Sequence, residues 1–172
     1  MPEKNIILVG FMGAGKSTVA AALVRCSNYH LLDLDAEIES RSGLKIQEIF
    51  RQQGESAFRD LESAALSALR GRKGLVVATG GGILGRPENR ELIGDIGQVV
   101  YLRTPFATLQ KRLEFCSDRP LIKEQPDWHV LEALFSSRIP FYETADLIID
   151  TNNKKPEEIA TEILLRLAEA QD

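Results

Sequence analysis

The sequence has few of the side chains that bind metals or cross-link a chain. It has 172 residues but only two cysteines and two histidines, so neither a disulfide framework nor a zinc pattern is indicated. Cys26 and Cys116 lie far apart and outside any C-x-x-C motif. We predict that both are reduced, semi-buried residues of a cytoplasmic protein, because that compartment keeps thiols reduced.

Long apolar runs and an excess of positive charge are also missing. No stretch reaches the roughly 20 apolar residues of a membrane-spanning helix, and the first residues are not those of a signal peptide. The formal net charge is −4, which disfavours general nucleic-acid binding. We therefore expect small-molecule ligands, no nucleic acid and no membrane. No exposed heptad or apolar stripe is evident, so a monomer is expected.

What the chain does contain is an alternation of short apolar runs with helical patterns. We expect one domain over residues 1–172. The apolar runs predicted to form strands are 5–9, 29–33, 75–78, 98–102 and 147–150. Alternation of this kind is typical of an α/β fold, in which helices cover both faces of a parallel sheet.

Helix signals fill the segments between these runs. The predicted helices cover residues 17–26, 36–41, 46–70, 87–93 and 105–114, and a last helix opens at Pro156. Gly54 is expected to divide the third of them. Two segments interrupt the alternation. Residues 34–70 are predicted to be a helical insert, and residues 115–126, with two prolines, are predicted to be a mobile lid.

A glycine-rich loop follows the first predicted strand. Residues 10–17, GFMGAGKS, match G-x-x-x-x-G-K-[ST] between a strand and a helix. Backbone N–H groups of such a loop converge on phosphate oxygens, the lysine reaches the β- and γ-phosphates, and the serine hydroxyl ligates Mg²⁺. The motif predicts binding of a nucleoside triphosphate with Mg²⁺. The residues expected to hold it are Gly13, Ala14, Gly15, Lys16, Ser17 and Thr18.

Other candidate residues follow two more strands, whose carboxyl ends should border the same crevice. Asp33 could join the Mg²⁺ shell through water. Asp35 could orient a substrate hydroxyl toward the γ-phosphate, or cap the helix that starts at Ala36. The triplet Gly80–Gly82 could admit a ligand close to the backbone, or form a flexible turn.

Three arginines could bind anionic groups of the ligands. Arg59 could hold a carboxylate while Glu62 braces it from three residues along the helix, although an exposed surface pair fits the pattern equally. The same alternative applies to Arg138. Arg119, in the predicted lid, could close on the γ-phosphate or be a solvated loop residue.

Together, and in this order, these motifs resemble the shikimate kinase family. The matching stretches are LVGFMGAGKST, LDLD, FRDLE, ATGGGI, DRPLI and SSRIPFYETAD, and they span nearly the whole chain. The resemblance implies a three-layer P-loop fold with a five-stranded parallel sheet in the order 2-3-1-4-5. It also implies transfer of the γ-phosphate of ATP to the 3-hydroxyl of shikimate, a step in chorismate and aromatic amino-acid synthesis.

The resemblance further implies a role for each candidate residue. Asp35 and the backbone of Gly80, Gly81 and Gly82 would bind the shikimate hydroxyls, and Arg59 and Arg138 would bind its carboxylate. Residues 34–70 would be the substrate-binding insert, where Phe50 and Phe58 line the pocket. Ser17 and Asp33 would serve Mg²⁺, and Arg112 and Pro156 would enclose the adenine. The catalytic residues would be Lys16, Asp35 and Arg119.

Three other functions compete with this interpretation. A kinase of another polyol or sugar acid, such as gluconate, would share the phosphate loop. A GTPase switch needs N-K-x-D, but Lys155 and Pro156 follow the pair Asn153-Lys154. A nucleotide sensor without chemistry would bind ATP but would not need Asp33, Asp35 and Arg119 together.

Overall fold

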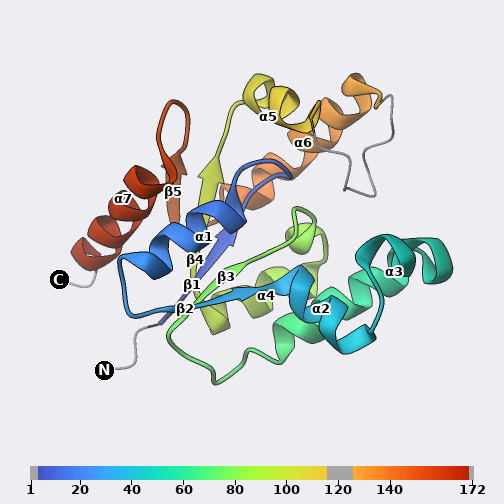
Figure 1. Cartoon of the computed structure of the whole chain (residues 1–172), viewed down its shortest axis with the longest axis horizontal. Coiled ribbons are helices and arrows are strands. Elements are labelled where there is room, and N and C mark those ends of the chain that lie inside the picture. The colour runs from blue at the N-terminus through green and yellow to red at the C-terminus, as the bar shows by residue number, and fades with distance from the viewer. Residues whose placement is uncertain (1–3, 116–125, 171–172) are drawn as a thin grey trace.

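The protein is built on a single parallel sheet, seen in the computed structural model of residues 4–115 and 126–170 (Figure 1). The strands are β1 (Asn5–Val9), β2 (His30–Asp33), β3 (Leu75–Ala78), β4 (Gly97–Arg103) and β5 (Leu147–Asp150). Their order is β2-β3-β1-β4-β5 and every neighbouring pair is parallel, which confirms the predicted fold. β1 and β3 are buried along their whole length, as apolar strands covered on both faces should be.

The register of the sheet brings the predicted site residues to one edge. Ala78, at the end of β3, pairs with Leu8 on one side and with Asp33 on the other. The glycine-rich loop, Asp33 and the glycine triplet therefore all begin at the same level, at the carboxyl ends of three adjacent strands.

Helices cover both faces of this sheet. They are α1 (Lys16–Arg25), α2 (Leu34–Ser42), α3 (Ile46–Ser67), η1 (Ile83–Gly85), α4 (Pro87–Ile96), α5 (Phe106–Leu113), α6 (Trp128–Tyr142) and α7 (Pro156–Glu169). α1 and α7 pack together on one face, while α4 lies behind the sheet and contacts β4 (Figure 1). α2 and α3 project to one side, so the insert of residues 34–70 extends beyond the sheet (Figure 1).

Several local signals of the sequence are confirmed. α4 and α7 have proline at their first position, as predicted at Pro87 and Pro156. α3 is interrupted at Gly54, whose φ of 84° and ψ of 172° are not helical. The helix over residues 46–70 is therefore divided at Gly54, as predicted.

Three details differ from the sequence predictions. α2 begins at Leu34 and its cap is Asp33, which accepts the N–H of Ala36, so of the two alternatives for Asp35 the role of helix cap is wrong. Cys26 is exposed, not semi-buried, because it ends α1 beyond the buried face; Cys116 lies outside the described residues. α6 was not predicted, because its apolar residues follow no clear period and Pro140 lies inside it.

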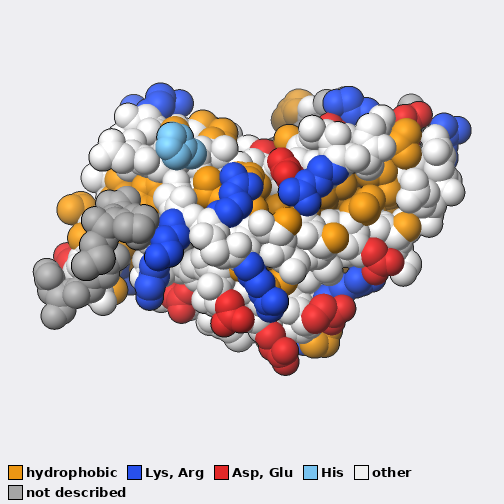
Figure 2. Space-filling model, turned by 90° about the horizontal axis from the view of Figure 1, so that it is seen from below, with side chains coloured by type: hydrophobic (Ala, Val, Ile, Leu, Met, Phe, Trp, Pro, Cys, Tyr) orange, Lys and Arg blue, Asp and Glu red, His pale blue; other side chains and the backbone are white. Residues whose placement is uncertain are grey.

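The distribution of surface charge and the composition of the helices relate to the predictions about nucleic acid and membrane. On the face shown in Figure 2, uncharged atoms separate most of the basic side chains, and acidic side chains are most numerous along the lower edge. Over residues 4–115 and 126–170, none of the helices combines the length and the apolar composition needed to cross a bilayer. Of the predicted lid, residues 116–125, with Arg119, lie outside the described residues.

Candidate active site

The glycine-rich loop, residues 10–16, joins β1 to α1. Gly15 precedes the helix in the left-handed conformation, with φ of 90°, which glycine adopts at no steric cost. α1 therefore begins at Lys16 with its free N–H groups at the loop. The ammonium of Lys16 donates to the carbonyls of Gly10 and Phe11, at 2.6 and 3.1 Å, and the residue is only 8% exposed. The loop thus encloses a positive charge beside a helix N-terminus, which suits an anion.

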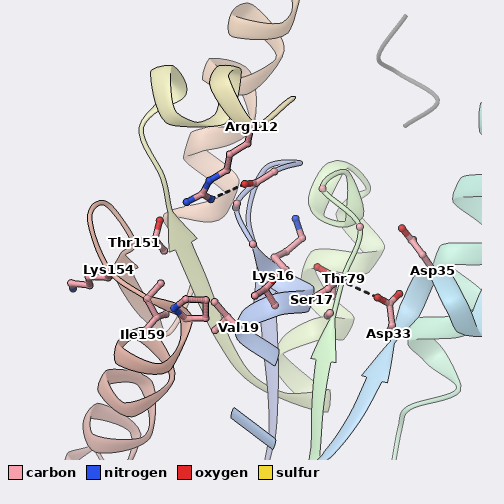
Figure 3. Close-up of a pocket in the computed structure, with 18 residues that line it drawn as sticks. Lys16, Ser17, Val19, Asp33, Asp35, Thr79, Arg112, Thr151, Lys154 and Ile159 are labelled. Carbon is pink, nitrogen blue, oxygen red and sulfur yellow. Dashed lines mark hydrogen bonds between the residues drawn. The ribbon is translucent and has the colours of Figure 1, made fainter. Parts of the chain in front are cut away.

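A cavity of about 390 Å³ opens over this loop (Figure 3). Arg112 reaches across from α5 and donates to the carbonyl of Gly13 at 2.8 Å, whereas Lys111 does not line the cavity. Pro156 and Ile159 form part of the wall contributed by α7. The cavity thus has a polar end at the loop and an enclosed end between Arg112 and α7, a shape that can hold phosphates and a base. The residues predicted for ATP that line it are Gly13, Ala14, Gly15, Lys16, Ser17, Thr18, Arg112 and Pro156.

Two oxygen ligands suitable for a magnesium ion lie beside the loop. The Ser17 hydroxyl donates to one carboxylate oxygen of Asp33 at 3.2 Å (Figure 3). The other carboxylate oxygen accepts the N–H of Ala36 at 3.1 Å. Oxygen atoms are the ligands that Mg²⁺ prefers, and this ion keeps several waters when bound. No cluster of three or more Asp, Glu, His or Cys side chains in the described residues forms a metal site by itself. The pair therefore fits an ion that takes its other ligands from phosphate and water.

A second cavity, of about 660 Å³, lies between the insert and the carboxyl end of the sheet. Both cavities are lined by Asp33, Asp35, Gly80 and Gly81, so they meet at this point. A molecule in the second cavity would lie next to the phosphate end of the first. The predicted acceptor residues that line the second cavity are Asp35, Phe50, Phe58, Arg59, Gly80, Gly81, Gly82 and Arg138.

Arg59 and Glu62 form a buried ion pair on the wall of this second cavity. Their nitrogen and oxygen are 2.6 Å apart, and their side chains are 15% and 1% exposed. Burial raises the pKa of Glu62, an effect that the charge of Arg59 opposes without cancelling. Burial alone would lower the pKa of Arg59, but Glu62 and Glu55 raise it overall. The predicted bracing by Glu62 is present, and the exposed-pair alternative is wrong.

The glycine triplet packs directly against this pair. A Cβ on Gly80 would lie 2.6 Å from the Glu62 carboxylate, and one on Gly82 would lie 2.6 Å from the Arg59 guanidinium. Neither glycine has a positive φ, so it is space and not backbone conformation that requires them. We expected a ligand to make the close approach, but the protein's own ion pair already does so. Within the described residues, the N–H groups of the triplet donate to no backbone or side-chain acceptor outside it.

Arg138 approaches the second cavity from α6. Its guanidinium lies over the ring of Phe11, 5.5 Å from the ring centre, and Phe11 belongs to the glycine-rich loop. Two arginines from different helices, Arg59 and Arg138, therefore line one cavity. Such an arrangement suits an anionic group such as a carboxylate.

Sequence reasoning missed several residues that line the cavities. The first cavity also contains Val19, Thr151, Lys154 and Ile159, and the second also contains Met12, Glu39, Lys45 and Ile46. Thr151 directly follows β5, so the rule that ligands bind at carboxyl ends of strands could have found it. Met12 belongs to the glycine-rich motif itself, and Lys154 lies in the loop between β5 and α7. The residues on helices face the cavities because of how those helices pack, for which the sequence carries no local signal.

A phosphate loop at the centre of a 2-3-1-4-5 parallel sheet, beside a second cavity lined by two arginines, defines a P-loop kinase of a small molecule. The family model described as shikimate kinase matches residues 12–168. Shikimate kinase from Geobacter sulfurreducens is 44% identical over 98% of this chain and 93% of its own. Shikimate kinase from Acinetobacter baumannii, solved in complex with shikimate, is 39% identical, with a TM-score of 0.92 over 98% of this chain and 94% of its own.

The chain therefore belongs to the shikimate kinase family. Shikimate kinase from Cupriavidus pinatubonensis, 43% identical over 95% of this chain and 85% of its own, agrees with this assignment. A member of this family is an enzyme that phosphorylates shikimate with ATP as co-substrate. A GTPase switch and a nucleotide sensor without chemistry are thereby excluded.

Proposed function

We propose that this chain transfers the γ-phosphate of ATP to the 3-hydroxyl of shikimate, with ATP in the first cavity and shikimate in the second. The observation that carries the proposal is that the two cavities share Asp33, Asp35, Gly80 and Gly81. The shared wall would bring the acceptor hydroxyl beside the γ-phosphate, and positioning supplies most of the catalysis in phosphoryl transfer.

Residues of the first cavity would bind the nucleotide. The N–H groups of residues 13–18 would surround the phosphates at the start of α1, and Lys16 would exchange a carbonyl partner for a phosphate oxygen. Arg112 and Pro156 would enclose the adenine between α5 and α7. Ser17 and Asp33 would hold the Mg²⁺, which, when bound, neutralises phosphate charge.

Residues of the second cavity would bind shikimate by its two kinds of polar group. Arg59, held in place by Glu62, and Arg138 would bind the carboxylate. The N–H groups of Gly80, Gly81 and Gly82 would donate to hydroxyls, since they have no other acceptor among the described residues. Residues 34–70 would thus form the substrate-binding insert, with Phe50 and Phe58 against the ring.

Asp35 would act at the junction of the two cavities. It would accept a hydrogen bond from the 3-hydroxyl and take its proton while the oxygen bonds to the γ-phosphorus. The bond from that phosphorus to the bridging oxygen breaks, and ADP leaves. Arg119 of the predicted lid would neutralise the charge on the transferred group. Arg119→Ala should therefore lower kcat far more than it raises the KM for shikimate.

The experiment that tests this function is an assay of ADP release with Mg²⁺ and ATP. It compares shikimate, gluconate, quinate and no acceptor at equal concentrations. We expect ADP release that saturates with shikimate, and no release above background with gluconate, with quinate or without an acceptor. Release that is no faster with shikimate than without any acceptor would contradict the proposal.

We also propose that the chain acts as a monomer in the cytoplasm, without nucleic acid or membrane partners. The use of ATP supports the compartment, and a sequence without an exposed heptad or apolar stripe supports the monomer. Light scattering after size exclusion should give the mass of one chain, 19.1 kDa, at the concentration used for the assay. A mass of twice that value would contradict the monomer.

A further inference from the structure

Tyr142, the last residue of α6, donates a hydrogen bond from its buried hydroxyl to the carbonyl of Gly81. The residue is 1% exposed, and its ring stacks on Tyr101 with centroids 5.0 Å apart. Burial raises the pKa of Tyr142 more than the charge of Arg138, and the hydrogen bond of the hydroxyl with that side chain, lower it. The hydroxyl therefore keeps its proton near neutral pH and remains a donor to the glycine triplet.

Gly81 is the residue at which the two ligand-binding loops touch. A Cβ there would lie 3.1 Å from the backbone nitrogen of Met12, in the phosphate loop. One side of Gly81 thus packs on the phosphate loop, and its carbonyl is held by Tyr142. The placement of the triplet relative to the phosphate loop consequently depends on this hydrogen bond.

The same bond also orients a donor for the substrate. The carbonyl of Gly81 and the N–H of Gly82 belong to one planar peptide unit and point in opposite directions. Holding the carbonyl therefore fixes the direction of the N–H. Gly82 lines the second cavity, and its N–H donates to no acceptor in the described part of the chain.

α6 contacts both loops at further points. The Arg90 guanidinium lies over the Phe141 ring, 4.3 Å from its centre, and donates to the carbonyl of Leu84, just after the triplet. Phe135 meets Phe11 of the phosphate loop edge to face, with centroids 5.3 Å apart. α6 is therefore a common support for the phosphate loop, residues 10–16, and for the glycine triplet, residues 80–82, which we call the acceptor loop.

We propose that Tyr142 is a positioning residue for phosphoryl transfer. Its hydroxyl fixes the Gly81–Gly82 peptide, so that the acceptor loop presents its N–H groups to shikimate at a set distance from the phosphate loop. Tyr142 touches neither substrate nor reacting atoms; it acts through Gly81 and also contacts the Arg138 side chain, which lines the second cavity. This inference rests on the proposed function, because it concerns the binding of shikimate.

The test compares Tyr142→Phe with Tyr101→Phe, in steady-state kinetics with each substrate varied. Each variant removes one hydroxyl from the same pair of stacked rings, but the hydroxyl of Tyr101 makes no hydrogen bond to the triplet. For Tyr142→Phe we expect the KM for shikimate to rise about tenfold and kcat to fall, while the KM for ATP stays within about twofold. Tyr101→Phe should keep both KM values. A merely structural role would lower the folded fraction, and thus kcat, without changing either KM.

Two outcomes would overturn the inference: an unchanged KM for shikimate in Tyr142→Phe, or an equal rise in both variants. If Tyr142→Phe does not fold, replacement of Tyr142 by 4-aminophenylalanine decides, because it keeps an N–H donor at the same place. A wild-type KM in that variant supports the role, and a tenfold increase overturns it. If the wild type itself does not phosphorylate shikimate, the proposed function fails instead.

Discussion

The two glycine loops at the carboxyl edge of the sheet need glycine for different physical reasons. In the phosphate loop, Gly13 and Gly15 have φ of 83° and 90°, and the nearest atom to a Cβ on Gly15 would be 3.9 Å away. In the acceptor loop, Gly80 and Gly82 have no positive φ, but a Cβ on either would lie 2.6 Å from a charged side chain. Gly15 is required for its backbone conformation, whereas Gly80 and Gly82 are required for space.

This difference explains why the phosphate loop can be identified from the sequence alone and the acceptor loop cannot. The residues that define the phosphate loop are contiguous, at positions 10–17, so a short motif identifies it. The acceptor loop is shaped by Arg59 and Glu62 from α3 and by Tyr142 from α6. The need for glycine at these positions arises only when distant parts of the chain have packed around them.

The largest expected effect comes from replacing one glycine of each loop, Gly80 or Gly15, by alanine and by asparagine. Gly80→Ala should lower kcat/KM for shikimate about 100-fold, because the Cβ displaces the Arg59–Glu62 pair. Gly80→Asn should be worse, since the side chain is larger. At Gly15 the order should reverse: alanine should reduce the free energy of unfolding by about 1–2 kcal/mol, and asparagine by less, because asparagine tolerates the left-handed region.

Urea unfolding and steady-state kinetics of these four variants measure the two orders. The same order of alanine and asparagine at both positions would show that one physical requirement governs both loops. That result would contradict the comparison.

A smaller effect is expected from Arg59→Lys, which tests the binding of shikimate in the second cavity and leaves the first cavity unchanged. Lysine keeps the charge but loses the fork of parallel donors, so the KM for shikimate should rise about tenfold while the KM for ATP stays unchanged. Arg86→Lys is the matched control, because Arg86 pairs with the exposed Asp60 and lines neither cavity. Isothermal titration with shikimate gives the affinities directly. Equal affinities for wild type and Arg59→Lys would remove Arg59 from the carboxylate site.

The smallest expected effect concerns the stability of the insert. The Glu39 carboxylate accepts the N–H of Ile46 at the start of α3 and pairs with Lys45, and these contacts lower the pKa of Glu39. A carboxyl whose pKa is lowered in the folded state adds stability above its usual pKa of about 4.3, and that stability is lost as the pH falls through the folded value. Glu39→Gln should therefore reduce the free energy of unfolding by about 1 kcal/mol at pH 7.

Urea unfolding between pH 7 and pH 3 measures this difference. It should shrink below the usual pKa of glutamate, and Glu37→Gln, on the same helix, is the control. A difference that stays constant down to pH 3 would mean that Glu39 acts by packing and not by its charge.

The parts of the molecule that sequence could predict are those specified over short distances. The five strands, the prolines that begin α4 and α7 and the break at Gly54 each follow from a local pattern. The strand order, and the roles that we propose for Arg59 and Arg138, came from the resemblance to a family. α6 was missed because its apolar residues follow no clear helical period and Pro140 lies within it. Tyr142 was missed with it, since its partner Gly81 is 61 residues away.

The central claim is that the two cavities meet so that phosphate passes directly from ATP to shikimate. Phosphorus NMR of wild-type protein with Mg²⁺, ATP and shikimate tests it most directly. The account predicts one new phosphate ester, on the 3-hydroxyl, formed in equal amount with ADP and without inorganic phosphate. ADP that forms together with inorganic phosphate, at a rate independent of shikimate, would contradict it.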